Sequence, residues 1–149
     1  MRTIETRIVI DAAPVKVWEV LTATETYPEW NPFVRELRGE LVTGSRIFVR
    51  IQPPGGSGMT FRPTVLVAEP GRELRWLGRA GIPGLFDGEH SFRLAAQPEG
   101  RTLFTHAESF RGILVPFMAG SLDATRAGFE AFNRALRDRV QAHARIVAG

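Results

Sequence analysis

A single long amphipathic helix follows a strand-rich stretch, and this order constrains the fold more than any other feature. Near the C-terminal end, mostly apolar residues recur at spacings of three and four, as on one face of a helix. These residues are Leu122, Thr125, Phe129, Phe132, Leu136, Val140, His143 and Val147. Ser121 or Asp123 is expected to cap the start of this helix. Because a long sheet must have one face covered, we expect the helix to pack on that face.

The rest of the chain predicts a first strand, two short helices and a run of about six strands. Apolar and polar residues alternate over 4–11, which predicts the first strand. Asp11 and Pro14 then indicate the start of a short helix. The residues that this helix should bury are Val17, Trp18 and Leu21. Prolines at 28 and 32 limit a second helix to one or two turns. The later strands are expected over 33–40, 46–52, 59–68, 72–79, 84–96 and 101–112.

Together these elements predict an α+β fold, in which a curved antiparallel sheet of about seven strands wraps around the C-terminal helix. A length of 149 residues suits one domain, here 1–149, and needs no disulfide to be stable. The chain has no cysteine, which excludes disulfides and thiolate metal ligands. No apolar run approaches the roughly 18–20 residues of a membrane span, and no signal-peptide pattern is seen at the N-terminus. We therefore expect a cytoplasmic protein without stable membrane insertion.

The basic balance of the chain, a net charge of +3, does not by itself indicate nucleic-acid binding. Lys16 is the only lysine, and the arginines are scattered along the sequence. Proteins that bind nucleic acid usually gather basic residues in a stripe, often with aromatic residues between them. Surface solubility is the simpler explanation of the charge, so no nucleic-acid partner is expected. The sequence leaves the oligomeric state open.

Three ionisable residues are expected on the inner face of the last two strands. Strict alternation places His90 on the same face as Phe92. On the next strand it places His106 and Glu108 between Phe104 and Phe110. With a turn near Pro98 and Glu99, the register puts His90 opposite either His106 or Glu108.

This polar group has several interpretations at the level of sequence. The three residues are buried polar groups that fix the sheet register, or anchors for a ligand, or an acid–base pair. Two histidines and a carboxylate also suit zinc, but no helical His-x-x-x-His spacing supports it, so we expect no metal and no cofactor. Trp18, Trp30 and Trp76 are expected in the core or the wall of a pocket. The apolar loops at 82–86 and 112–118 either pack at the helix junction, or form an entrance for a hydrophobic ligand or a transient membrane contact.

The sequence resembles the SRPBCC superfamily, which includes START-like lipid-binding domains and the polyketide cyclase/dehydrase family. The segments that carry the resemblance are 13–33, 84–94, 102–116 and 128–140. They are most similar to a bacterial polyketide-cyclase-like branch. The resemblance implies a helix-grip fold with a deep cavity between the sheet and the long helix. Members bind lipids, hormones, quinones or polyketides, and only some are enzymes.

The leading hypothesis is a protein that binds or carries a small hydrophobic molecule. The predicted ligand-binding residues are His90, His106, Glu108, Phe92, Phe104, Phe110, Trp18, Trp30, Trp76, Phe129, Phe132, Asn133 and Leu136. The alternative is a cyclase- or dehydratase-like enzyme in which the histidine and glutamate side chains transfer protons. A third alternative is a module that binds a protein partner through its basic surface or apolar loops.

Overall fold

The computed structural model describes residues 1–117 and 119–148, and the side chains of 1–116 and 122–144. The strands are β1 (Arg2–Ile10), β2 (Val34–Arg38), β3 (Phe48–Ile51), β4 (Met59–Phe61), β5 (Thr64–Glu69), β6 (Glu73–Arg79), β7 (Asp87–Gln97) and β8 (Arg101–Arg111). The α-helices are α1 (Pro14–Thr22), α2 (Tyr27–Trp30) and α3 (Ala119–Ala148). Short 3-10 turns are η1 (Thr24–Thr26), η2 (Pro98–Gly100) and η3 (Val115–Phe117).

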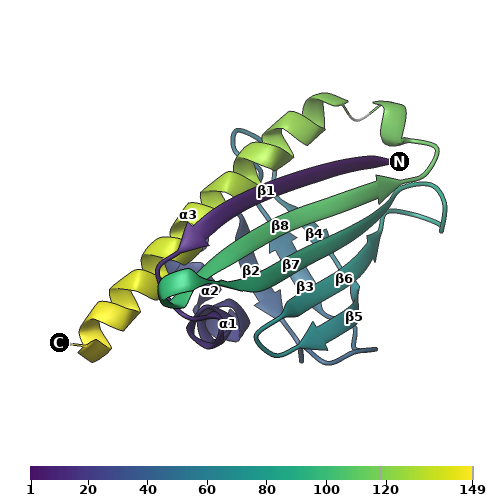
Figure 1. Ribbon diagram of the computed structural model, residues 1–149. Helices are drawn as coiled ribbons and strands as arrows, with labels where there is room; N and C mark the ends of the chain where they lie inside the picture. The colour runs from purple at the N-terminus through teal and green to yellow at the C-terminus, as the bar shows by residue number, and fades with distance from the viewer. Residues whose placement is uncertain (118, 149) are drawn as a thin grey trace.

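The strands form an α+β fold around the long helix, as predicted, but they divide into two antiparallel sheets. One sheet has the order β1-β8-β7-β6-β5 and the other the order β2-β3-β4. The single strand expected over 59–68 is interrupted at Arg62 and Pro63, because proline has no N–H for a sheet ladder. Hydrogen bonds from Val65 to Ser45 (2.8 Å) and from Ile47 to Pro63 (2.9 Å) join the two sheets. The result is a curved wall with the three-stranded sheet behind the larger one (Figure 1).

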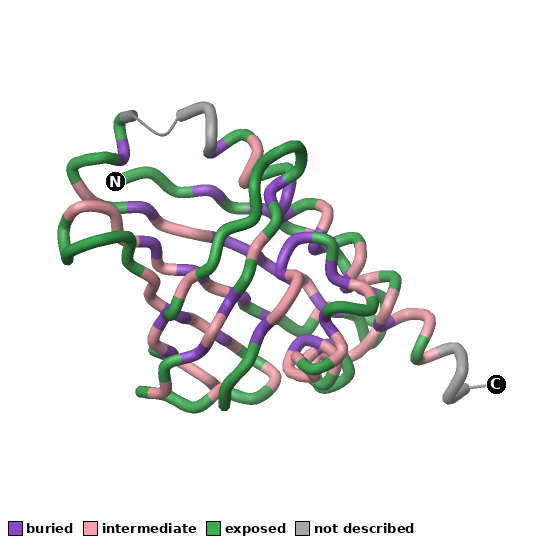
Figure 2. The backbone as a smooth tube through the Cα atoms, turned by 180° about the vertical axis from the view of Figure 1, so that it is seen from behind, coloured by how far each residue is buried: buried purple, intermediate pink, exposed green. Residues whose placement is uncertain are grey.

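Helix α3 runs along the larger sheet and packs on its inner face (Figure 1). Phe129, Phe132 and Leu136 are fully buried. The ring of Phe132 stacks on that of Phe92 with centroids 5.3 Å apart. Gly128 lets the helix approach the start of β2, since a Cβ atom there would be 2.4 Å from the ring of Phe33. Buried and exposed positions alternate along the strands beneath it, as Figure 2 shows.

Several details of the predicted helix face and caps need correction. Helix α3 begins at Ala119, before Ser121 and Asp123, so both lie within the helix rather than before it. His143 is exposed, because the helix extends beyond the sheet there, and the side chain of Val147 is outside the described residues.

The start of α1 also differs from the prediction. Its N-cap is Ala13, with no side-chain cap, and Pro14 begins the helix. Asp11 is exposed instead, and its N–H donates to Gln141 Oε1 at 2.9 Å. Trp18 is only half-buried, whereas Val17 is buried as expected.

A buried tyrosine fixes the short helices. The hydroxyl of Tyr27 donates to the carbonyl oxygen of Leu21 at the end of α1. Burial raises the pKa of Tyr27, so the phenol remains protonated throughout the physiological range. This contact, together with the edge-to-face packing of Tyr27 on Phe132, holds α1 and α2 against α3.

Candidate functional site

A cavity of about 240 Å³ lies between the inner faces of the two sheets and the first turns of α3. Its apolar wall is formed by Phe33, Val49, Ile51, Met59, Phe61, Pro63, Trp76, Ala80, Phe86, Phe110 and Leu122, with Gly78 and Gly88. Its polar side chains are Arg79, His90, Glu108 and Thr125. At about 30 Å³ per water molecule, this volume corresponds to roughly eight waters. The cavity therefore suits a small, mainly apolar molecule with a few polar groups.

Four of the predicted ligand-binding residues line this cavity: His90, Glu108, Trp76 and Phe110. The other nine lie outside its lining. Most of them form the packed core under α3: Phe92, Phe104, His106, Phe129, Phe132, Asn133 and Leu136. Trp18 and Trp30 are partly buried near the short helices and pack against that core. The cavity therefore involves only some of the predicted residues, and it lies toward the N-terminal end of α3.

The register of β7 and β8 brings the ionisable side chains together. His90 pairs with Glu108 across the ladder, one of the two predicted alternatives, and Phe92 pairs with His106. His90 Nδ1 lies 3.4 Å from Glu108 Oε1. The two histidines meet diagonally, with their Nε2 atoms 2.7 Å apart. A line of polar contacts therefore runs from the cavity wall into the core.

The inner end of this line fixes the tautomer of His106. The Thr6 hydroxyl donates to the carbonyl oxygen of His106 at 3.0 Å, so it accepts from Asn133 Nδ2 at 2.8 Å. The amide oxygen of Asn133 therefore faces His106 Nδ1 at 2.9 Å and accepts its proton. Burial, and next the nearby His90, lower the pKa of His106 well below its usual value. The imidazole of His106 is thus neutral, with the proton on Nδ1.

The tautomer of His106 determines which nitrogen of His90 carries a proton. Because His106 Nε2 carries a lone pair, His90 Nε2 must carry the proton between them. His90 Nδ1 then faces Glu108 Oε1 at 3.4 Å, which exceeds the usual hydrogen-bond range of about 2.7–3.2 Å. Both groups therefore keep hydrogen-bonding capacity for a polar group in the cavity.

A glycine makes room for the carboxylate. A Cβ atom at Gly88 would lie 2.4 Å from Glu108 Oε2. Glu108 is therefore positioned by the absence of a side chain on the neighbouring strand, and its own side chain is 18% exposed, at the cavity wall. We expect Gly88→Ala to displace this carboxylate, which is at the end of a flexible side chain.

Acid should destabilise the protein through His106. The pKa of His106 in the folded state lies below its unfolded value of about 6.5. Below that pH the unfolded chain binds a proton that the folded chain does not, so the free energy of unfolding falls as pH falls. One such proton gives a slope of up to about 1.4 kcal/mol per pH unit. Urea unfolding between about pH 7.5 and 5.5 measures this slope.

Two histidine variants separate this effect from general acid sensitivity. His106→Gln keeps a hydrogen-bonding side chain but cannot titrate, so its slope should be smaller than that of the wild type. His143→Gln removes an exposed histidine and should leave the slope unchanged. Equal slopes in wild type and His106→Gln would contradict the assignment.

The two apolar loops expected near the strand ends lie next to each other. The N–H of Ile113 donates to the carbonyl of Gly84, and that of Leu114 to Leu85. Ile82, Ile113 and Leu114 are exposed, whereas Val115 is buried and Phe86 lines the cavity. The loops therefore contribute to core packing, and they also present exposed apolar side chains, so their role as an entrance stays a prediction. Met118 is outside the described residues.

The part of the chain that the structure describes contains neither a metal-binding cluster nor a membrane-spanning helix. No group of three or more His, Cys, Asp or Glu side chains among these residues is arranged to hold a metal ion. No described helix is both long and apolar enough to cross a bilayer.

A long helix held by curved antiparallel strands, with a cavity between them, defines a protein of the helix-grip class. A family model described as polyketide cyclase / dehydrase and lipid transport matches residues 1–145, and the chain belongs to this family. The predicted SRPBCC membership is thereby confirmed. No curated protein matches the sequence.

Solved structures show the same fold. The Zhui aromatase/cyclase from Streptomyces sp. R1128 is 15% identical, with a TM-score of 0.81 over 99% of this chain and 98% of that chain. Protein MLL2253 from Mesorhizobium loti is 21% identical, with a TM-score of 0.73 over 95% and 98%. A START superfamily protein from Mycobacterium smegmatis is 18% identical, with a TM-score of 0.68 over 94% and 97%. At these identities the similarity establishes the fold.

Most cavity residues contributed by the smaller sheet were absent from the predicted site. Val49 and Ile51 share one face of β3, and their alternation with Arg50 was a usable signal. Met59 and Phe61 lie on β4, where an unbroken strand was expected and no face could be assigned. Met59 and Phe61 line the cavity because the smaller sheet folds over the larger one. The alternation of apolar and polar residues along one strand does not show how two sheets pack.

Proposed function

We propose that the protein binds a small, mainly apolar molecule in the cavity, and that Glu108 and His90 bind a hydroxyl or carbonyl group on it. The observation that carries the proposal is the placement of this carboxyl–imidazole pair on a mainly apolar wall. A carboxyl group and an imidazole each donate or accept hydrogen bonds according to their protonation, so together they suit a carbonyl or a hydroxyl group. Family membership supports the same function, because lipid transport is part of the family description.

Matched aromatic ligands test both parts of the proposal. Naphthol and methylnaphthalene have similar size, but only naphthol carries a hydroxyl. Trp76 lines the cavity, so quenching of its fluorescence can report binding. We expect the wild type to bind both, and naphthol roughly tenfold more tightly, because a hydrogen bond to a charged group contributes about 1.5–3 kcal/mol.

Three variants test whether the ligands bind in this cavity and whether Glu108 contacts the hydroxyl group. Ile51→Trp fills it and should abolish the binding of both ligands, whereas Val15→Trp on the exposed face of α1 should change neither affinity. Glu108→Leu should keep methylnaphthalene binding and lose the preference for naphthol. Unchanged binding in a folded Ile51→Trp variant would show that the ligand lies elsewhere.

A second candidate function is acid–base catalysis on a bound ligand. The specific observation that favours it is the placement of His90 Nδ1 and Glu108 Oε1, an imidazole and a carboxyl group, 3.4 Å apart at the cavity wall. In such a reaction one member of the pair removes a proton from carbon or oxygen, and the protonated member can return it elsewhere.

Nitrobenzisoxazole is a suitable probe of a general base in an apolar cavity. Removal of its C–H proton breaks the N–O bond and releases a coloured cyanophenolate, with no other reactant. We expect acceleration by the wild type to be lost in Glu108→Gln and reduced in Gly88→Ala, in which the carboxylate is displaced. Equal rates in all three proteins would exclude Glu108 as a base toward this probe.

A further inference from the structure

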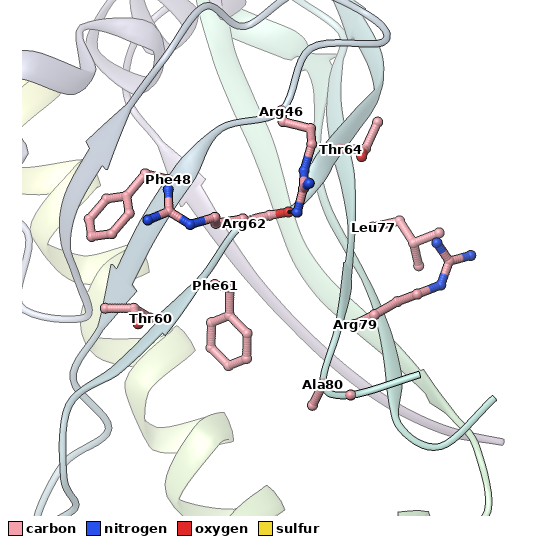
Figure 3. A pocket seen from close by; sticks show the side chains of 10 residues that line it. Arg46, Phe48, Thr60, Phe61, Arg62, Thr64, Leu77, Arg79 and Ala80 are labelled. Atoms are coloured by element: carbon pink, nitrogen blue, oxygen red, sulfur yellow. Dashed lines mark hydrogen bonds between the residues drawn. The ribbon is translucent and has the colours of Figure 1, made fainter. Parts of the chain in front are cut away.

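A second concave site lies on the outer surface, where the two sheets separate. This outer groove has a volume of about 670 Å³ and is lined by Arg46, Phe48, Thr60, Phe61, Arg62, Thr64, Leu77, Arg79, Ala80 and Gly81. The labelled side chains come from residues 46–48 and 60–64, which include the start of β3, part of β4 and the first residue of β5, and from residues 77–80 at the end of β6 (Figure 3). Three of its residues are arginines, and none is acidic.

Two of these arginines contact other groove residues without being neutralised. Arg46 Nη2 donates to the carbonyl oxygen of Arg62 at 3.3 Å. The guanidinium of Arg62 lies over the ring of Phe48, 5.3 Å from its centroid (Figure 3). Among the described residues, no carboxylate lies within 4.0 Å of either guanidinium, whereas Arg79 lies 3.6 Å from Asp87. The groove therefore contains two guanidinium groups with unused donors, beside the hydroxyls of Thr60 and Thr64.

The outer groove adjoins the inner cavity. Phe61, Arg79 and Ala80 line both of them. Among the described strands, β4 pairs with β3 alone, and the pairing of β5 with β6 ends at Thr64 and Leu77. Gly78 and Arg79 consequently pair with β7 on one side only. No backbone ladder therefore joins Met59–Phe61 to Gly78–Arg79, and side chains such as Phe61 and Arg79 separate the groove from the cavity there.

We propose that the outer groove binds the anionic head group of an amphipathic ligand, a carboxylate or a phosphate monoester, whose apolar part reaches the cavity past the side chains of Phe61 and Arg79. The proposal rests on the proposed function, because the apolar part occupies the same cavity. Planar guanidinium groups fit both head groups through paired N–H donors. His90 and Glu108, in the inner cavity, then contact the end of the ligand that is far from the charged head group.

Three probes with the same ten-carbon chain separate the head group from the apolar part. Decanol, decanoate and decyl phosphate are titrated calorimetrically below their micelle concentrations. We expect the wild type to bind the anions roughly tenfold or more tightly than decanol, as for hydrogen bonds with charged groups. This preference should shrink at high salt, because screening weakens partly exposed charges. The ranking of decanoate against decyl phosphate distinguishes the two head groups.

The Arg46→Gln/Arg62→Gln double variant should bind decanol as the wild type does and lose the preference for anions. The control double variant Arg2→Gln/Arg134→Gln removes the same charge from exposed positions elsewhere and should keep the preference. An anion preference that survives in Arg46→Gln/Arg62→Gln, or is absent from the wild type, would overturn the proposal. Failure of decanol itself to bind, or to respond to Ile51→Trp, would instead count against the cavity and its proposed function.

Discussion

Replacing Phe129 by alanine is expected to lower the free energy of unfolding by about 3–5 kcal/mol. Phe129 is fully buried, and its ring stacks on the imidazole of His106 with centroids 3.9 Å apart. It also contacts His90 (5.0 Å) and Phe33 (5.5 Å), so it joins α3 to both sheets. Alanine would leave a void that the surrounding strands cannot close. Total stabilities are about 5–15 kcal/mol, so the variant should lie close to the threshold of folding.

Urea denaturation at neutral pH measures this loss, and Phe129→Leu is the matched control. Leucine keeps most of the volume and should cost less than about 1.5 kcal/mol. In Phe129→Ala, water entering beside His106 should also relieve the burial that lowers its pKa, so the acid-dependent slope should shrink. A loss below about 1 kcal/mol would show that the ring does not bridge the sheets as described.

The fold was largely predictable because its strongest signals are local. Period-two alternation along β7 and β8, with a proline-containing turn between them, was enough to place His90, His106 and Glu108 on the inner face. The spacing of Phe129, Phe132 and Leu136 likewise identified the buried side of α3. Such patterns fix which way a side chain points once the element exists.

The extent of the cavity was less predictable, because it depends on where α3 leaves the sheet. Leu122 and Thr125, on the first turns, line the cavity, but Phe129 one turn later is packed directly against His106. A single apolar helix face therefore includes both cavity wall and solid core. The periodicity of the helix is the same in both parts, so the predicted ligand contacts include residues that do not line the cavity.

The clustering of arginines in the outer groove was also not predictable from the sequence. Arg46, Arg62 and Arg79 are far apart in sequence, which was interpreted as a scattered distribution. The break at Pro63 and the backbone pairing of residues 44–47 with 63–65 bring Arg46 beside Arg62. Dispersed arginines in a sequence are thus no evidence against a basic site, because sheet pairing joins distant segments.

Replacing Asn133 by leucine is expected to cost about 2–4 kcal/mol, because two buried hydrogen bonds are lost at once. Asn133 accepts from His106 Nδ1 at 2.9 Å and donates to Thr6 at 2.8 Å. Leucine has a similar size but offers neither group. Arg134→Leu, at the next and exposed helix position, is the control and should change stability by no more than about 0.5 kcal/mol.

The same variant tests the line of contacts that ends at the cavity. Without the Asn133 acceptor, His106 is no longer held with its proton on Nδ1, and a proton on Nε2 would oppose that of His90 across 2.7 Å. The imidazole nitrogen chemical shifts should therefore change for both histidines in Asn133→Leu and for neither in Arg134→Leu. Because His90 then loses its fixed orientation toward Glu108, the preference for naphthol over methylnaphthalene should weaken while methylnaphthalene still binds. If Asn133→Leu shifted neither histidine, the orientation of His90 toward Glu108 would not depend on the buried residues behind it.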